Sequence, residues 1–187
     1  ILILVLMVVQ SNHVVFASPL EQSSGPALAL PEIHIQSGET ATVELNFQAN
    51  GNNISSLIFS LDIDSSHLAF DPTDRDNNGI PDSIVLDIPS QFTTSLSYDP
   101  KDEDGEIDVM IADVFPPLST LPDGNLIIFS FQSINIEKAA KSQILFSLDP
   151  PISFGDSTGK SVSGKLTNGI VWIEALSTLQ PTATSKP

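Results

Sequence analysis

The chain has 187 residues, no cysteine and a formal net charge of −16. This length suits one domain with a real core, and the missing cysteines exclude disulfides, thiolate metal sites and thiol catalysis in this chain. Seven Lys and Arg residues are too few for the clustered basic face that nucleic-acid binding requires.

The first 17 residues have the features of a secretory signal. Ile1–Val9 is an unbroken apolar run, shorter than the roughly 20 residues of a membrane span. Val15 and Ala17 occupy the −3 and −1 positions of a signal-peptidase site. A buried N-terminal strand is the less favoured alternative, because no polar residue alternates within the run. We expect residues 1–17 to be a signal peptide truncated at its start, residues 18–26 an N-terminal extension, and the protein to be secreted or cell-surface.

Residues 27–176 alternate apolar and polar side chains in short runs, which is typical of half-buried strands. In Thr40–Gln48, for example, every second residue from Val43 to Phe47 is apolar. About nine strands separated by turn signals predict an all-β antiparallel sandwich. The expected strands lie in Ala27–Ile35, Thr40–Gln48, Ile54–Ile63, Leu68–Phe70, Ser83–Ile88, Phe92–Tyr98, Ile107–Val114, Asn125–Ile134, Ile144–Leu148 and Gly169–Glu174.

Two segments interrupt or follow this strand pattern. Glu137–Ser142 (EKAAKS) has the composition of a brief helix. Residues 177–187 (STLQPTATSKP) are rich in Ser, Thr and Pro and contain little to bury, so we expect an extended Thr/Pro-rich linker after the domain.

The stretch Asp71–Asp82 (DPTDRDNNGIPD) has the spacing of a calcium loop. Oxygen-bearing side chains at every second residue, followed by Gly79, allow a short backbone to turn around one hard cation. The position where an EF-hand carries its bidentate Glu is Val85, so the pattern matches only the first half of that loop. A merely solvated acidic turn is the alternative. The expected ligands are the side chains of Asp74, Asp76, Asn78 and Asp82 and the carbonyl of Ile80.

The surrounding charge favours a bound cation. Residues 62–108 contain thirteen Asp and Glu and two basic residues, a net charge of −11 that repels itself unless cations neutralise part of it. A second acidic run, Asp99–Asp108, could form another calcium loop, complete the first site, or be a solvated hairpin. The possible additional ligands are therefore Asp71, Asp99, Asp102 and Asp104.

The order of the strand motifs resembles the cohesin domains of bacterial cellulose-degrading assemblies and their relatives outside such assemblies. The resemblance covers Pro31–Glu174, and the inserted acidic loop is similar to the calcium repeats of thrombospondin type 3. The motifs are Ser37-Gly38-Glu39-Thr40 before Val43–Phe47, Ile54–Leu57, Asp62–Asp64, Leu68 and Phe70, Gly105–Val109, Ala112-Asp113, and Asp123–Leu126 before Ile127–Phe131.

This resemblance implies a nine-stranded jelly-roll sandwich over residues 27–176 that is non-catalytic and binds a dockerin-type partner through one sheet face. The fold is shared with carbohydrate-binding modules, so an alternative is a module linked to polysaccharide degradation. A structural spacer in a multi-module surface protein is the further alternative. In all three, calcium at the acidic loop would be structural.

The sequence offers no pattern of catalytic residues. The three histidines are His13 in the signal segment, His34 in a strand that exposes it to solvent, and His67 beside a turn. Nucleophilic catalysis requires Ser or Thr next to such a base, and the clustered carboxylates are better explained by cation binding. We therefore do not expect an enzyme.

Aromatic residues that could contact a ligand are few. Sugar-binding surfaces stack rings on exposed Trp or Tyr, and this chain has one of each, Trp172 and Tyr98. Most of the ten Phe residues fit core positions, which leaves Phe92, Phe115 and Phe154 as candidates for exposed contacts. A protein-binding face is therefore favoured over a flat polysaccharide-binding strip.

Overall fold

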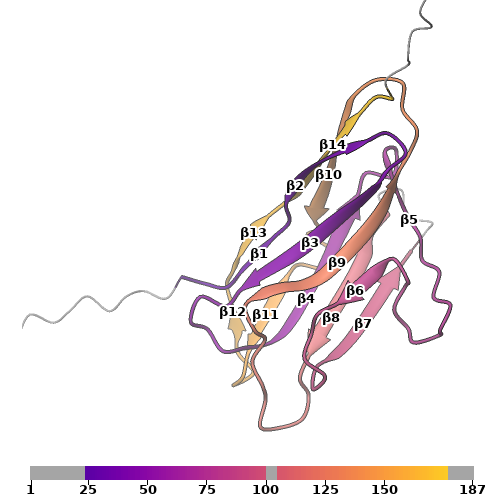
Figure 1. The fold of residues 1–187 in the computed structure, drawn as a ribbon. Helices are drawn as coiled ribbons and strands as arrows, with labels where there is room; N and C mark the ends of the chain where they lie inside the picture. Colours follow the sequence, from indigo (N-terminus) through magenta and orange to yellow (C-terminus); the bar gives the residue numbers. More distant parts are fainter. Residues whose placement is uncertain (1–23, 100–104, 177–187) are drawn as a thin grey trace, which may run out of the picture.

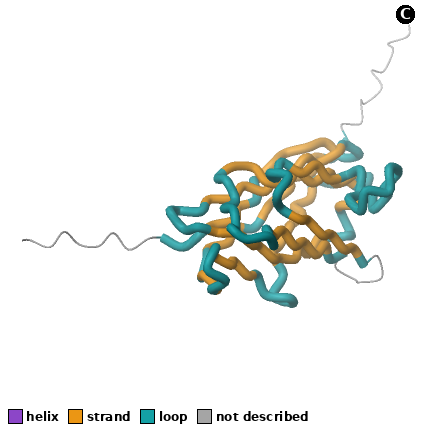
Figure 2. The backbone as a smooth tube through the Cα atoms, turned by 90° about the horizontal axis from the view of Figure 1, so that it is seen from below, coloured by secondary structure: helices purple, strands orange, loops and turns teal. Residues whose placement is uncertain are grey.

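The computed structural model describes residues 24–99 and 105–176, which form two β-sheets packed face to face (Figure 1). Figure 2 shows the strands gathered at the centre, with loops around them. The expected signal peptide, most of the N-terminal extension and the Thr/Pro-rich linker lie outside the described residues. No helix long and apolar enough to cross a membrane occurs among the residues described.

Sheet A has the strand order β13–β1–β3–β9–β5, and β6 also pairs with β9. Its centre is the antiparallel pairing of β3 with β9, which runs from Thr40 opposite Gln132 to Phe47 opposite Gly124. The strands of this sheet are β1 (Ala27–Ala29), β3 (Thr40–Gln48), β5 (Leu68–Phe70), β6 (Ile84–Leu86), β9 (Gly124–Ser133) and β13 (Lys165–Thr167).

Sheet B has the order β12–β11–β4–β10–β14–β2. One edge of β4 pairs with β11 in its first half and β10 in its second half, while its other edge pairs with β8, which in turn pairs with β7. The strands are β2 (Glu32–Gln36), β4 (Ile54–Ile63), β7 (Thr93–Tyr98), β8 (Ile107–Ala112), β10 (Ala140–Phe146), β11 (Ser153–Asp156), β12 (Ser161–Val162) and β14 (Gly169–Glu174).

The core lies between the two sheets and is built by the alternation in their longest strands. In β3 every second residue from Ala41 to Phe47 is fully buried. In β4 the same is true of Leu57, Phe59 and Leu61, and between them Ile58 is exposed on the outer face whereas Ser60 is buried. Each buried Leu or Phe contributes about 1.5–3 kcal/mol relative to exposure, so the central strands fix the position of the loops that they carry.

The predicted all-β sandwich is confirmed, and residues 24–99 and 105–176 contain fourteen strands in place of about nine. The number rises partly because Ala27–Ile35 is divided at Pro31, with β1 in sheet A and β2 in sheet B. Two pairings at the sheet edges, β1 with β13 and β14 with β2, are parallel in an otherwise antiparallel fold.

The predicted brief helix at Glu137–Ser142 is wrong. Residues 137–139 form a bend and a short coil, and β10 begins at Ala140. In that strand Ser142 lies opposite Val171 of β14 and is fully buried. Pairing with a neighbouring strand therefore overrides the helix-forming composition of the segment.

Candidate functional site

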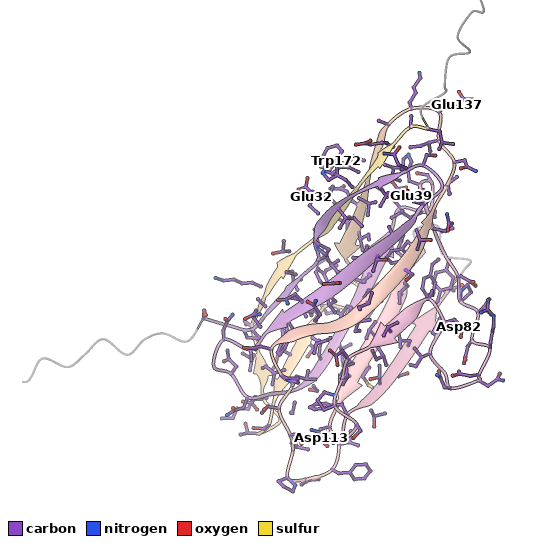
Figure 3. The ribbon with its side chains drawn as sticks, in the orientation of Figure 1. Glu32, Glu39, Asp82, Asp113, Glu137 and Trp172 are labelled. Carbon is purple, nitrogen blue, oxygen red and sulfur yellow. The ribbon has the colours of Figure 1, made fainter. Side chains whose placement is uncertain are left out.

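The loop between β5 and β6 brings together three of the predicted calcium ligands. The N–H of Asp82 donates to the carbonyl of Thr73 at 2.8 Å, which closes the loop on itself. One carboxylate oxygen from each of Asp74, Asp76 and Asp82 lies within 4.8 Å of the others. Figure 3 shows Asp82 on this loop at one side of the molecule.

Backbone N–H groups hold the Asp74 carboxylate in place. It accepts hydrogen bonds from the N–H of Gly79 at 2.8 Å and of Asn78 at 3.2 Å. The positive φ angles of Asn77 (54°) and Gly79 (85°) bend the backbone so that these donors face it. These bonds, the one from Gly79 foremost, hold the pKa of Asp74 below its usual value against the smaller opposing effect of burial.

The donor set fits a hard divalent cation. Calcium binds oxygens at about 2.3–2.6 Å, so two ligands on opposite sides of one ion lie about 4.6–5.2 Å apart. The carboxylate oxygens of Asp74, Asp76 and Asp82 lie within 4.8 Å of one another, so they can contact the same ion. Asn78 is already engaged, because its Oδ1 accepts from the N–H of Ile80 at 2.7 Å and its Nδ2 donates to Asp76 at 3.0 Å.

Other charged groups near the loop have separate roles. Arg75 Nη1 lies 3.3 Å from Asp82 Oδ2, an exposed ion pair that competes for one of the three carboxylates. Asp71 accepts from the N–H and the hydroxyl of Thr73, and the hydroxyl bond foremost lowers the Asp71 pKa. Asp99 is exposed, while Asp102 and Asp104 lie outside the described residues.

The aromatic candidates are distributed differently from the expectation. Phe92 and Phe154 are 8% and 1% exposed, so the prediction that they form exposed contacts is wrong. Tyr98 is half-buried and packs edge-on against Phe70, with ring centroids 4.9 Å apart. Phe115 alone among the three phenylalanines is exposed as predicted, with 76% of its surface accessible.

A buried carboxylate fixes the loop that carries Phe115. Asp113 follows β8 and accepts hydrogen bonds from the N–H of Ser119 at 2.7 Å and of Phe115 at 3.1 Å. These bonds, the one from Ser119 foremost, lower the pKa of Asp113. Sequence reasoning did not assign this residue a role, although an Asp two residues before its N–H partner is the usual sign of an Asx turn.

The outer face of β4 and β8 carries apolar side chains. Ile58 and Met110 are directly opposite in the antiparallel pairing, and each is 39% exposed. Together with Pro150 and Ser95 they line a shallow depression of about 120 Å³. Sequence reasoning missed this pair because it depends on the register between β4 and β8.

Trp172 stands in a row of side chains across the other half of sheet B. Lys141 of β10 and His34 of β2 are its direct cross-strand neighbours. The His34 ring is stacked on it at 6.1 Å, the Lys141 ammonium lies 5.4 Å from its ring centroid, and its Nε1 donates to Glu32 Oε1 at 2.6 Å. His34 is exposed, as its position in the strand predicted.

His67 meets a serine and an aspartate, but in an order unsuited to nucleophilic catalysis. Asp64 Oδ2 lies 2.7 Å and Ser66 Oγ 3.0 Å from the same imidazole nitrogen, Nδ1. A hydroxyl nucleophile activated by histidine bonds one ring nitrogen while the orienting carboxylate bonds the other. The cluster instead closes the turn after β4, where Ser66 also donates to Asp64.

No protein-family model and no curated protein matches the sequence. Solved structures with a similar fold do exist. The sixth cohesin of Acetivibrio cellulolyticus scaffoldin B, determined in complex with a Cel5 dockerin, aligns with a TM-score of 0.60 and 23% identity, covering 81% of this chain and 100% of that one. The seventh ScaB type I cohesin of Pseudobacteroides cellulosolvens gives 0.62 and 14%, covering 86% and 99%.

A cohesin from outside cellulose-degrading assemblies is also similar. The non-cellulosomal cohesin of the archaeon Archaeoglobus fulgidus aligns with a TM-score of 0.51 and 16% identity, covering 82% of this chain and 94% of that one. These structures share the two-sheet architecture with the present chain over nearly their whole length. The chain therefore has the cohesin fold.

Proposed function

We propose that this chain is a non-catalytic, cohesin-like module that binds a protein partner of the dockerin type. The observation that carries the proposal is the exposed apolar pair Ile58 and Met110 on the outer face of sheet B. The Acetivibrio cohesin with the same fold is in complex with a dockerin, which supports this class of partner.

The chemistry of this face suits a protein rather than a small polar ligand. Leu148 is 84% exposed in the turn after β10, and the N–H of the preceding Ser147 donates to the carbonyl of Ser60 in β4. Phe115 is presented beyond the end of β8 by the Asp113 turn. Exposed apolar and aromatic side chains gathered around one sheet are typical of the central part of a protein interface.

Binding of purified dockerin modules to Ile58→Asp and Met110→Asp tests the proposal. A panel that includes the Cel5 dockerin is measured by titration calorimetry. We expect each variant to lose at least about tenfold in affinity, because a carboxylate would be buried unpaired in the interface. Val85→Asp places the same charge at an exposed position of sheet A and serves as the control.

Two results would contradict the proposed interface. The first is that no dockerin in the panel binds the unaltered chain. The second is that Val85→Asp weakens binding as much as the substitutions at Ile58 and Met110. The loss of affinity would then not be specific to the β4–β8 face.

Calcium at the Asp71–Asp82 loop is the second part of the proposal. Three carboxylates that converge within 4.8 Å support it, together with an Asp74 side chain that is already oriented by backbone N–H groups. The ion would offset the local negative charge and stabilise the connection between β5 and β6. Its role would be structural.

The module would act outside the cell and without catalysis. The apolar Ile1–Val9 run, with small residues at the −3 and −1 positions before residue 18, supports secretion or display at the cell surface. The shared use of His67 Nδ1 by Asp64 and Ser66 supports a non-enzymatic role for the one serine–histidine–aspartate cluster described above.

A further inference from the structure

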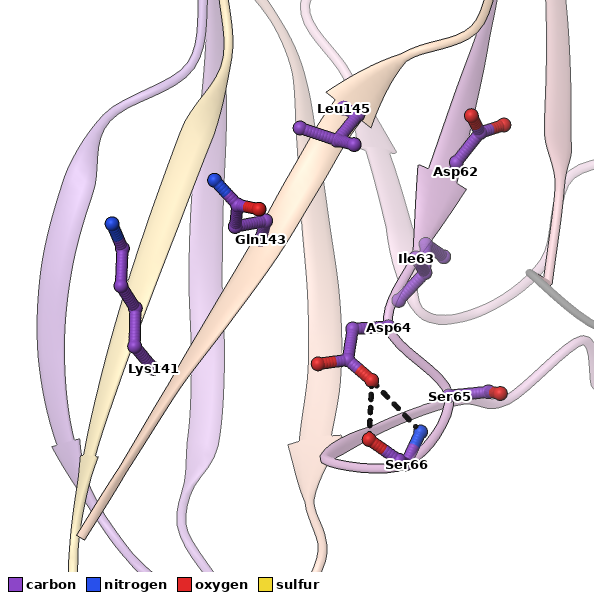
Figure 4. A pocket seen from close by; sticks show the side chains of 8 residues that line it. All are labelled: Asp62, Ile63, Asp64, Ser65, Ser66, Lys141, Gln143 and Leu145. Atoms are coloured by element: carbon purple, nitrogen blue, oxygen red, sulfur yellow. Dashed lines mark hydrogen bonds between the residues drawn. The ribbon is translucent and has the colours of Figure 1, made fainter.

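An open pocket lies on the outer face of sheet B, beside the β4–β8 face, and six of its eight lining residues are polar or charged. It has a volume of about 500 Å³ and is formed where β4 ends and the chain turns away from β10 (Figure 4). β4 pairs with β10 only as far as Ile63 opposite Ile144, so the preceding part of β10 lacks a β4 neighbour. The cavity is lined by Asp62, Ile63, Asp64, Ser65, Ser66, Lys141, Gln143 and Leu145.

We propose that this cavity is a binding site for a neutral, hydroxyl-rich ligand, such as one or two sugar residues of a glycan chain. Its volume falls within the range of about 300–1,000 Å³ that is usual for small-molecule sites. β10 supplies one side of the pocket, and the end of β4 with the turn that follows it supplies the other. The pocket lies further along β4 than Ile58 and is lined by other residues, so it extends the proposed function of the module.

The charges of the lining residues select the ligand class. The lining carries charges of both signs, so an anion meets repulsion from Asp62 and Asp64 and a cation meets repulsion from Lys141, whereas a neutral ligand meets neither. A sugar hydroxyl both donates and accepts hydrogen bonds, and it can therefore pair with carboxylate, hydroxyl, amide and ammonium groups together.

Two of the lining groups are available to a ligand. Within the part of the chain that the structure describes, the Lys141 ammonium and the Gln143 amide form no hydrogen bond or ion pair. Asp64, by contrast, is fixed by Ser66 and His67. The cavity thus combines a rigid carboxylate with two uncommitted hydrogen-bonding side chains from the adjacent strand.

An aromatic side chain borders the same surface. Trp172 is the cross-strand neighbour of Lys141, whose ammonium lies 5.4 Å from the indole centroid. A ligand that draws Lys141 toward its own hydroxyls would uncover part of the ring, and sugar C–H groups pack favourably on such a surface. Trp172 is also the single tryptophan of the chain, so its fluorescence reports on events at this site.

Titration with defined tetrasaccharides tests the proposal. The neutral probes are cellotetraose, xylotetraose and mannotetraose, tetragalacturonate is the anionic probe, and a tetralysine peptide is the cationic one. We expect at least one neutral probe to bind by calorimetry and to change the Trp172 fluorescence. Its affinity should fall about tenfold or more in Lys141→Ala and in Gln143→Ala, because each loses a ligand hydrogen bond.

Lys165→Ala is the matched control, since Lys165 is an exposed lysine on β13 of the other sheet. It should leave both the affinity and the fluorescence response unchanged. Melting curves of all three variants check that they are folded. The proposal is overturned if none of the neutral probes binds, if only tetragalacturonate or tetralysine binds, or if Lys165→Ala weakens binding as much as Lys141→Ala. No dockerin takes part, so these outcomes are separate from the test of the β4–β8 face.

Discussion

Two loops of this sandwich are held by aspartate side chains, and they differ in how the negative charge of those side chains is compensated. Figure 3 labels Asp82 in one and Asp113 beside the other. In the loop between β5 and β6, three carboxylates converge and the nearby cation is Arg75, which pairs with Asp82. In the loop after β8, the single carboxylate of Asp113 accepts two backbone N–H groups.

The difference indicates which loop depends on its surroundings. The Asp113 turn is complete within the chain, because the donors that compensate the charge belong to the same loop. The acidic loop leaves an excess of negative charge that a divalent ion would offset. We therefore expect the Asp113 loop to be indifferent to calcium and the loop between β5 and β6 to respond to it.

The largest effect should come from Asp113→Ala. This substitution removes the acceptor of the Ser119 and Phe115 N–H groups, and partly buried donors left without a partner are costly. We expect the melting temperature to fall more than it does on chelation, and by the same amount with calcium or with chelator. Binding of a dockerin should weaken too, since Phe115 loses its support.

Asp87→Ala is the control for this change, because Asp87 is exposed and lies outside both aspartate-held turns. It should leave the melting temperature and dockerin binding nearly unchanged. A melting temperature for Asp113→Ala equal to that of the control would show that the turn contributes little to stability.

Chelation should produce the next largest effect. If free calcium stands 100-fold above its dissociation constant, removing it costs about 2.7 kcal/mol. For a domain of this size each kcal/mol corresponds to about 2–4 °C. We expect excess chelator to lower the melting temperature by several degrees, and calcium to restore it.

Asp74→Asn should abolish that response, while Asp71→Asn, just outside the three-carboxylate cluster, should retain it. Scanning calorimetry of the three proteins with and without chelator makes the comparison. An unaltered chain whose melting curve ignores excess chelator would remove the calcium proposal.

Acid should affect both loops in the same direction. The pKa values of Asp113 and Asp74 are lowered, by the N–H groups of Ser119 and Gly79 foremost. Each carboxyl therefore binds fewer protons when folded, and its stabilising contribution is present above its usual pKa of 3.8 and is lost as the pH falls through the lowered value. Denaturant unfolding should show stability falling below about pH 4.

Asp113→Asn should flatten this acid dependence, because the carboxyl whose pKa is lowered in the folded state is then absent. The same measurement in chelator separates the two loops, because bound calcium would hold the Asp74 carboxylate ionised to lower pH. A slope that is identical in the unaltered chain and in Asp113→Asn would contradict the assignment.

Much of the framework follows from local sequence. The alternation in Thr40–Gln48 and Ile54–Ile63 predicts strands whose observed bounds are the same, because one face of each is buried. The convergence of Asp74, Asp76 and Asp82 also follows from spacing, since a short loop with Gly79 must turn sharply.

What depends on pairing between distant segments was not predicted. The parallel contact of β2 with β14 sets His34 beside Trp172, and no local pattern encodes that register. Phe92 and Phe154 were expected to be exposed because they were set apart from the phenylalanines that fit core positions of the strands, yet both are buried. The apolar pair Ile58 and Met110 likewise exists only through the alignment of β4 with β8.

The smallest effect, and the sharpest comparison of the two loops, should come from Arg75→Ala. The guanidinium lies 3.3 Å from Asp82 and is largely exposed, so the pair contributes at most about 1 kcal/mol. In chelator we expect a slight loss of stability, because the positive charge that pairs with Asp82 is gone. With calcium the sign should reverse, since Arg75 no longer competes for the Asp82 carboxylate and the loop binds the ion more tightly. Calcium titration by calorimetry, alongside melting curves in chelator, measures both. If Arg75→Ala weakens calcium binding, the guanidinium helps to form the ion site and does not compete with the ion for Asp82. That result would contradict the proposal that Arg75 and calcium compensate the same negative charge.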